Sequence, residues 1–185
     1  MSLPYSIALD SNSTIFYVAD AGNHRILKFV FNITTGTLIA GGQGPGTATN
    51  QLYFPTCIYF DSASNSLFIT NMNAYSVVQW VLGSSIWKLV AGIPGSYGST
   101  PLSLNNPQGV TLDSAGNIYV ADTSNHRIQL FRPGNATGTT IAGSGNTPGA
   151  SSSLLNNPRS VLVDNQLNLY VSDTNNDRIQ MFTRC

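Results

Sequence analysis

The sequence predicts an all-β fold, a β-propeller with four blades, and two observations lead to that prediction. One module is repeated four times, in residues 4–29, 55–80, 107–131 and 158–182. Equivalent positions recur every 51 residues, and a period of this size is typical of solenoids, propellers and arrays. The recurring position is held by Asp20, Asn71, Asp122 and Asp173. Each module also divides into short β-prone runs bounded by turn residues, with no sustained helical period.

The third module, PQGVTLDSAGNIYVADTSNHRIQLF, shows the strands of one blade most clearly. Residues 109–112 form an apolar run that ends in Asp113, and residues 114–117 supply a turn in which Gly116 is free to take a positive φ. Three further β-prone runs follow, in residues 118–121, 127–131 and 139–142. A second tight turn separates the first two of these at residues 123–125. We therefore expect each blade to be four antiparallel strands, called a to d.

The fourth strand of each blade has a signature of its own, reading TLIAG, KLVAG and TIAG in the first three modules. A long loop rich in Gly, Pro and Ser follows each signature, and each loop ends in a leucine three residues before the next Pro. These leucines are Leu52, Leu104 and Leu155. We expect each of them to pin its loop to the core.

Repeated four-stranded sheets that are apolar on both faces are the units that a β-propeller stacks around an axis. Residues 118–121 are apolar at successive positions, as a strand covered on both sides should be. One blade cannot bury its faces alone, so its neighbours must cover them. We therefore expect a single propeller domain over residues 1–185, with repeats at approximately 3–50, 51–103, 104–153 and 154–185.

The last blade is expected to lack its outer strand. We count about fifteen strands, because the fourth module stops at residues 183–185, just after its third strand. A closed propeller usually completes its last blade with a strand from the other terminus, which avoids open edges. Here neither terminus supplies it. The sequence is then either a four-bladed ring with one three-stranded blade or a piece of a longer propeller.

Composition argues against several classes of partner. Charged residues make up 9% of the chain and the formal net charge is zero, so no general attraction to nucleic acid or to an anionic membrane is expected. No stretch approaches the roughly 18 apolar residues of a membrane span. Met1 is followed at once by the first module, without a signal peptide. The abundance of Asn, Ser, Thr and Gly nevertheless favours an extracellular protein.

The third module resembles an NHL repeat, a unit named for its Asn-His-Leu-type turn. Three modules carry such a turn, at Asn23-His24-Arg25, Asn125-His126-Arg127 and Asn176-Asp177-Arg178. The second module departs from it, because residues 71–76 have lost the Asp, the His and the Arg. The resemblance implies a β-propeller, most often six-bladed, whose members are mostly binding platforms. Other members belong to ubiquitin ligases or bind RNA, and one related propeller is the metal-dependent peptidyl-hydroxyglycine amidating lyase.

All eight carboxylates are Asp, and the chain has no Glu. Seven of them end an a or a b strand, where an Asp accepts hydrogen bonds from the backbone of the following turn. These seven are Asp10, Asp20, Asp61, Asp113, Asp122, Asp164 and Asp173. The eighth, Asp177, takes the turn position that His24 and His126 hold in other modules. No carboxylate is then left over for acid–base catalysis.

The arginines that open three of the c strands are expected to be structural. Each follows the Asp of its own turn by five positions, and the second module has lost both residues together. The expected pairs are Asp20 with Arg25, Asp122 with Arg127, and Asp173 with Arg178. Binding of a ligand phosphate or carboxylate by these arginines is the alternative.

No metal site and no cofactor are expected. The two histidines hold equivalent turns that point apart in a ring, whereas a zinc site needs three or four converging ligands. We expect each histidine to bond within its own blade. Cys57 aligns with Ser6, Gly109 and Ser160, at a position near the axis that requires a small residue, and is expected to be an unreactive thiol. Two cysteines do not make a disulfide framework, although Cys185 is free to pair with another chain.

Residues that break the repeat are the candidates for a binding site. Tyr53, Phe54, Met72 and Tyr75 lie on the side of the b–c turns and the d–a loops, which gather on one face of a propeller. An aromatic patch with little charge suits a protein contact, and repacking of a degenerate blade is the alternative. We therefore predict a non-catalytic binding or scaffold module for a protein or peptide partner, or else for a glycan. The competing functions are a propeller lyase or hydrolase with an axial metal, and the recognition propeller of a ubiquitin ligase or RNA-binding protein.

Overall fold

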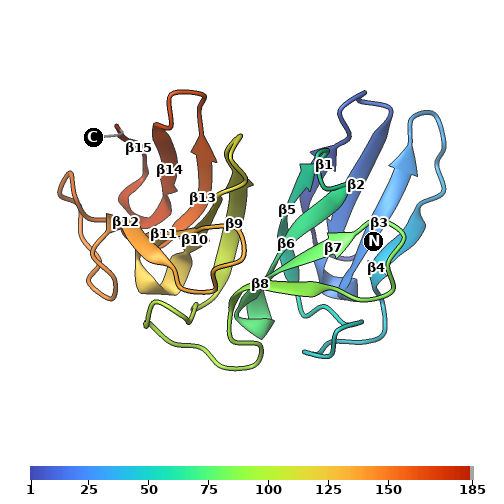
Figure 1. The fold of residues 1–185 in the computed structure, drawn as a ribbon, viewed down its shortest axis with the longest axis horizontal. Helices are drawn as coiled ribbons and strands as arrows, with labels where there is room; N and C mark the ends of the chain where they lie inside the picture. Colours follow the sequence, from blue (N-terminus) through green and yellow to red (C-terminus); the bar gives the residue numbers. More distant parts are fainter. Residues whose placement is uncertain (184–185) are drawn as a thin grey trace.

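The structure is a computed structural model that describes residues 1–183, and it consists of four antiparallel sheets (Figure 1). The first sheet contains β1 (Pro4–Leu9), β2 (Ile15–Asp20), β3 (Arg25–Val30) and β4 (Thr37–Gly41). The second contains β5 (Pro55–Asp61), β6 (Ser66–Asn71), β7 (Ser76–Val81) and β8 (Lys88–Gly92). The third contains β9 (Pro107–Leu112), β10 (Ile118–Asp122), β11 (Arg127–Phe131) and β12 (Thr139–Gly143). The fourth contains β13 (Pro158–Val163), β14 (Leu169–Asp173) and β15 (Arg178–Phe182).

The predicted fold class is confirmed. The chain has a four-bladed propeller arrangement in which consecutive strands pair in chain order, and the sheet of the last blade has three strands. The strand boundaries expected in the third module differ from those found by no more than two residues. The expectation for Cys185 lies outside the described residues. Within the described residues, no helix is long and apolar enough to cross a membrane.

Each b–c connection is one turn of 3₁₀ helix. These turns are η1 (Ala21–Asn23), η2 (Met72–Ala74), η3 (Thr123–Asn125) and η4 (Thr174–Asn176). Each is closed by a non-glycine residue in the left-handed region, with φ between 52° and 56°. The four closing residues are His24, Tyr75, His126 and Asp177. The turn is short because this residue reverses the backbone at once into the c strand.

The 3₁₀ turns and the d–a loops lie together at one end of the molecule, the lower end in Figure 1. We call this end the loop face. Backbone hydrogen bonds join the two kinds of segment within each blade: the N–H of Ser124 donates to the carbonyl of Asn105 at 3.1 Å, and the N–H of Asn175 donates to that of Asn156 at 3.0 Å. The turn therefore holds the loop that brings the chain into its own blade.

The apolar core lies between blades rather than within them. Its three clusters of buried side chains each join two consecutive sheets. In the cluster between the third and fourth blades, Tyr119 and Ile128 of one sheet pack with Val161 and Val171 of the next. We call the side of a sheet that faces the following blade its trailing face, and the side that faces the preceding blade its leading face. Every internal interface packs a trailing face against a leading face.

Small and apolar residues close the spaces at these interfaces. Leu52, Leu104 and Leu155 are fully buried and belong to the three clusters, one in each. Near the axis, a Cβ added at Gly109 would lie 2.7 Å from the carbonyl oxygen of Arg159 on the neighbouring a strand. The a strands approach so closely there that the position tolerates only a small side chain.

We expect Ile128→Ala to lower the free energy of unfolding by about 2–5 kcal/mol, because its side chain is fully buried between two blades. Ile179 holds the equivalent position in the last blade but is 69% exposed. Ile179→Ala is therefore the matched control and should change the stability by less than about 0.5 kcal/mol. Urea unfolding followed by circular dichroism measures both, and equal losses would contradict a core that lies between blades.

Candidate functional site

The predicted binding residues lie on the loop face of the second blade, each in contact with another aromatic ring or with the backbone of the patch. The ring of Tyr53 meets His24 edge to face, with centroids 5.5 Å apart and planes at 88°. The ring of Phe54 meets Tyr5 in the same way at 5.4 Å and 70°. Edge-to-face pairs of this kind add stability beyond the area that they bury. The two neighbours, Tyr5 and His24, both come from the first blade.

A second aromatic pair continues the surface. Tyr75 contacts Tyr97 of the following d–a loop, with ring centroids 5.5 Å apart. The two pairs are joined through the backbone, because the N–H of Met72 donates to the carbonyl of Phe54 at 3.2 Å. The N–H of Asn73 donates to the carbonyl of Tyr53 at 3.1 Å.

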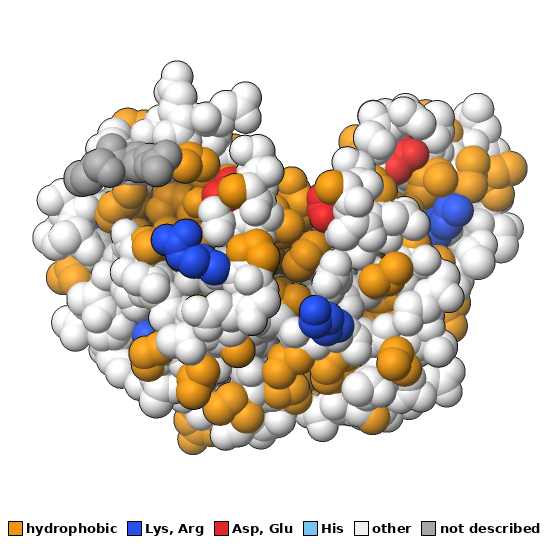
Figure 2. All heavy atoms as spheres, in the orientation of Figure 1, with side chains coloured by type: hydrophobic (Ala, Val, Ile, Leu, Met, Phe, Trp, Pro, Cys, Tyr) orange, Lys and Arg blue, Asp and Glu red, His pale blue; other side chains and the backbone are white. Residues whose placement is uncertain are grey.

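We call this surface the aromatic patch. It consists of Tyr5, His24, Tyr53, Phe54, Met72, Tyr75 and Tyr97. Tyr5, Tyr53 and Tyr97 are exposed, and none of the seven carries a formal charge when His24 is neutral. In Figure 2 hydrophobic side chains gather along the lower edge, which is the loop face, and the charged side chains facing the viewer lie above that edge. The aromatic patch is therefore a surface with aromatic rings, exposed hydroxyl groups and no formal charge.

Three of these residues were missed by the sequence reasoning. Tyr5 and His24 belong to a blade that follows the repeat, and Tyr97 lies in a loop without any repeat register. Their contribution depends on the packing of one blade against the next, which brings the first blade beside Tyr53 and Phe54. The available signal was that Tyr97 is aromatic in a loop composed mostly of Gly, Ser, Pro and Thr.

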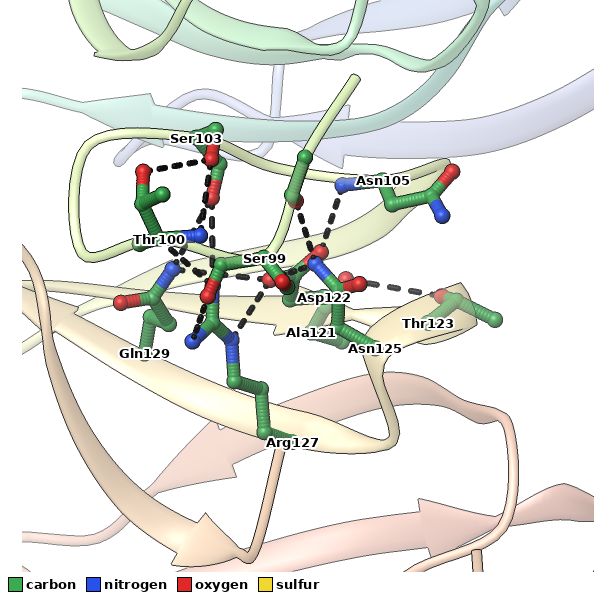
Figure 3. A network of polar contacts seen from close by, with 11 residues as sticks. Ser99, Thr100, Ser103, Asn105, Ala121, Asp122, Thr123, Asn125, Arg127 and Gln129 are labelled. Carbon is green, nitrogen blue, oxygen red and sulfur yellow. Dashed lines mark hydrogen bonds and ion pairs between the residues drawn. The ribbon is translucent and has the colours of Figure 1, made fainter. Parts of the chain in front are cut away.

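A buried polar clamp supports the loop face of the third blade (Figure 3). Asp122 is fully buried, and one of its oxygens accepts hydrogen bonds from Asn125 Nδ2 and Arg127 Nε, both at 2.8 Å. Its other oxygen accepts the backbone N–H of Asn105 at 2.7 Å. The clamp therefore joins the 3₁₀ turn, the c strand and the incoming loop at one carboxylate.

The far end of the arginine extends this clamp into the loop. Nη1 of Arg127 donates to the carbonyl of Ser99 at 2.9 Å, and Nη2 donates to those of Thr100 and Ser103 at 3.0 and 3.2 Å. The predicted ion pairs are present in all three blades, with Nε to Oδ2 distances of 2.7–2.8 Å. The contacts to loop carbonyls were not predicted, because the loop has no motif that marks which carbonyls face the guanidinium.

The second blade lacks the clamp. Asn71 Oδ1 still accepts the N–H of Tyr53, but Asn71 Nδ2 and Ser76 Oγ are buried without a hydrogen-bond partner in the described chain. The incoming loop is held instead by Trp87, whose Nε1 donates to the carbonyl of Gln51 at 2.8 Å. The aromatic patch thus lies at the blade where the arginine clamp has been replaced.

The histidines connect adjacent blades, so the expectation that each bonds within its own blade was wrong. Nδ1 of His24 accepts the N–H of Phe54 at 3.2 Å, and Nδ1 of His126 accepts the N–H of Asn157 at 3.1 Å. Both donors come just before the first strand of the next blade. Burial lowers the pKa of His126 below its ordinary value, and the nearby Asp122 carboxylate opposes this shift.

The remaining titratable groups are engaged in turns or in packing. Asp113 accepts the backbone N–H groups of Ala115 and Asn117, both at 2.9 Å, and the Tyr119 hydroxyl at 2.9 Å. Asp10, Asp61 and Asp164 accept hydrogen bonds in their own turns in a similar way. Burial raises the pKa of the Cys57 thiol, which favours the unreactive form. Within residues 1–183, no group of three or more His, Cys, Asp or Glu side chains is placed to hold a metal ion.

The fold and the repeated clamp define a repeat-built β-propeller. Residues 104–131 match the family model described as NHL repeat. The chain is 40% identical over 85 residues to NHL repeat-containing protein 2 of Homo sapiens, a match that covers 42% of this chain and 12% of that protein. It is 37% identical over 88 residues to NHL repeat-containing protein 3 of Homo sapiens, covering 46% of this chain and 25% of that protein. The likeness to NHL repeats that the turns predicted is confirmed for the third module.

Solved structures share the fold at low sequence identity. A protein of unknown function from Bacteroides thetaiotaomicron has a TM-score of 0.77 at 16% identity, covering 97% of this chain and 47% of that one. An auxiliary nutrient binding protein from the same species has a TM-score of 0.72 at 16% identity, covering 95% of this chain and 46% of that one. A gluconolactonase from Xanthomonas campestris has a TM-score of 0.75 at 16% identity, covering 100% of this chain and 59% of that one. The chain thus spans about half the length of these structures, and the likeness shows the fold alone.

The clamp predicts a graded loss of stability. Arg127→Met should lower the free energy of unfolding by about 3–5 kcal/mol, because it leaves the fully buried Asp122 carboxylate without its cation. Arg178→Met removes the equivalent arginine, whose side chain is 31% exposed, and should cost less. Urea unfolding of the two variants measures the difference, and an equal or reversed order would contradict burial as the cause.

The His126 contact predicts a loss of stability in mild acid. Because its pKa is lower in the folded protein than the ordinary 6.5, the unfolded chain binds the proton more readily. The stability that His126 contributes is therefore fully present above about pH 6.5 and is lost as the pH falls through the lower pKa of the folded state. His126→Asn keeps an acceptor and tolerates the left-handed backbone but does not titrate. Urea unfolding at about pH 7.5 and about pH 5.5 should show that the free energy of unfolding falls less between the two pH values for this variant than for the unchanged chain.

Proposed function

We propose that this chain is a non-catalytic binding module that holds a protein or peptide partner on the aromatic patch. The observation that carries the proposal is the joining of two aromatic clusters, around Tyr53 and around Tyr75, into one surface that lacks charge. Aromatic residues and Met are enriched at protein interfaces, whereas Lys, Glu and Asp are depleted there. Tyrosine is especially suited, because it offers a large contact area at a low cost in conformational entropy.

The support beneath the patch favours binding with little rearrangement. Tyr53 and Phe54 have their backbone N–H groups held by Asn71 and His24, and their carbonyls accept from the second 3₁₀ turn. The exposed rings therefore project from a backbone that is fixed on both sides. A preorganised surface loses less entropy when it binds.

The arrangement of the carboxylates supports the non-catalytic part of the proposal. Seven Asp side chains accept hydrogen bonds from their own turns or clamps. A general base has to be free to take a proton from a substrate, and none of these seven lies in the aromatic patch. Solved propellers of this fold include both a binding protein and a gluconolactonase, so the site rather than the fold has to decide between the two classes.

Selection of peptides from a random phage-displayed library tests the proposal. Enriched peptides should bind the purified chain and lose at least about tenfold in affinity with Tyr97→Ala and with Tyr53→Ala, because exposed aromatic anchors carry most of the energy of such contacts. Ile86→Ala removes an exposed side chain from the β7–β8 loop and is the matched control.

Two results would contradict the proposal. One is enrichment of peptides whose binding is unchanged by both tyrosine substitutions. The other is a rise of several degrees in the melting temperature with micromolar calcium or zinc, because a bound metal would support the competing class of propeller enzymes. Binding of arrayed glycans in place of peptides would mean that the partner of the patch is a glycan rather than a protein or peptide.

A further inference from the structure

A groove of about 380 Å³ lies between the second and third blades. One wall comes from β8 and the β5–β6 turn, and the other comes from the β9–β10 turn and the β11–β12 loop. These segments all belong to the two complete four-stranded sheets in the middle of the chain, so the groove does not depend on the uncovered faces of the end blades. Its volume is within the range of small-molecule sites.

The floor of the groove is apolar and belongs to the core between the two blades. Phe68 of β6, Leu112 of β9 and Ile118 of β10 line it, and each is only 5–7% exposed. Val90 of β8 packs against the same cluster, and the neighbouring Leu89 lines the groove while remaining 40% exposed. An apolar ligand body placed in the groove would therefore remove apolar surface from water.

Two basic side chains line the groove, one from each blade. Lys88 begins β8, and Arg132 follows the last residue of β11. Both residues are exposed, and neither side chain takes part in an ion pair within residues 1–183. They differ in this respect from the three arginines of the b–c turns, each of which is paired with an aspartate.

One carboxylate also lines the groove, but its own turn engages it. Oδ1 of Asp61 accepts the N–H of Ala63 at 3.2 Å, and Oδ2 accepts the N–H of Ser64 at 3.1 Å. Asp61 forms no ion pair with Lys88 or Arg132 in the described part of the chain. The groove therefore has a formal charge of +1 and two cations free to meet an anion, whereas the whole chain has a formal net charge of zero.

Both basic residues depart from the repeat. Lys88 is the first residue of its d strand, where the first and third blades have Thr37 and Thr139. Arg132 is the sixth residue counted from the start of its c strand, where the first two blades have valine. The corresponding groove between the first and second blades is lined by no charged side chain. The positive charge is therefore not a consequence of the repeat.

The wall that carries Arg132 is held in place by a tight turn. The N–H of Asn135 donates to the carbonyl of Arg132 at 3.0 Å, with Pro133 and Gly134 between them. Gly134 has a φ of 75°, which the third position of a type II turn requires. Oδ1 of Asn135 accepts the N–H of Thr137 at 2.9 Å, which fixes the amide group at the edge of the groove.

We propose that this groove binds a small organic anion. The apolar body of the ligand lies on the floor formed by Phe68, Leu112 and Ile118, and its anionic group meets Lys88 and Arg132. Small-molecule sites combine an apolar lining with a few polar groups that fix orientation, and guanidinium and ammonium groups pair with carboxylate and phosphate. The inference does not depend on the aromatic patch, because no residue of the patch lines the groove.

Titration of the purified, isotope-labelled chain, followed by nuclear magnetic resonance, tests the inference. The probes are 2-naphthoate, naphthalene-2-sulfonate and 2-naphthyl phosphate, which share one apolar body and differ in their anionic group. At least one should bind with a Kd below about 1 mM, the affinity expected of a ligand of this size. The shifted backbone amides should centre on residues 88–90 and 134–136. Neutral 2-naphthamide should bind at least about tenfold more weakly.

Two substitutions test the role of the charges. Lys88→Met and Arg132→Met should each weaken binding of the best anionic probe about tenfold, the loss expected for one contact between charged groups. Neither should change the binding of 2-naphthamide. Arg159→Met is the matched control, because it removes an exposed cation that has no ion pair in residues 1–183 and does not line the groove. Circular dichroism melts should be unchanged for all three variants, because each substituted side chain is exposed.

Three outcomes would overturn the inference. The first is that none of the three anions binds with a Kd below about 1 mM. The second is binding whose amide shifts centre outside the groove, at the aromatic patch or elsewhere. The third is binding that 2-naphthamide equals or that Lys88→Met and Arg132→Met leave unchanged, because the two cations would then contribute nothing to recognition.

Discussion

The structure depends on one constraint: a sheet of four short strands cannot cover its own apolar faces. Every buried cluster in this chain joins two blades, so the stability of each blade comes from its neighbours. The repeat of 51 residues follows from this constraint, since each blade has to present the same pair of faces. It also explains why Ile128 is fully buried whereas the equivalent Ile179 is mostly exposed.

Polar contacts then fix the position of the loop that connects one blade to the next. The Asp122–Arg127 clamp ties the incoming loop to the turn, and the His126 contact ties the turn to the next blade. Burying Asp122 and Arg127 is tolerated because both are hydrogen-bonded. Where the clamp is missing, at Asn71 and Ser76, a different set of contacts holds the loop and aromatic side chains reach the surface. The candidate site is thus a local departure from a repeated structural device.

Much of this was predictable because the repeat displays the same physical requirement four times. The strands, the pairing of Asp122 with Arg127 and the burial of Leu104 all follow from residues that recur at fixed positions. The direction of the histidine contacts was predicted wrongly, since sequence shows that His126 occupies a turn but not which backbone N–H faces its ring. The partners of Tyr53 and Tyr75 were missed for a similar reason, because they come from another blade and from an irregular loop.

The sequence by itself determined the fold class, the number of blades, the likeness to NHL repeats and the residues that break the repeat, because periodicity and turn chemistry are local properties of the chain. Only the tertiary structure decided which side chains gather in the aromatic patch and which apolar faces stay uncovered. Both depend on how one blade packs against another. Tyr5 and Phe54 are 49 positions apart, and no local pattern shows that their rings meet. Ile128 and Ile179 hold the same place in the repeat, and only the presence of a neighbouring blade makes one of them core and the other surface.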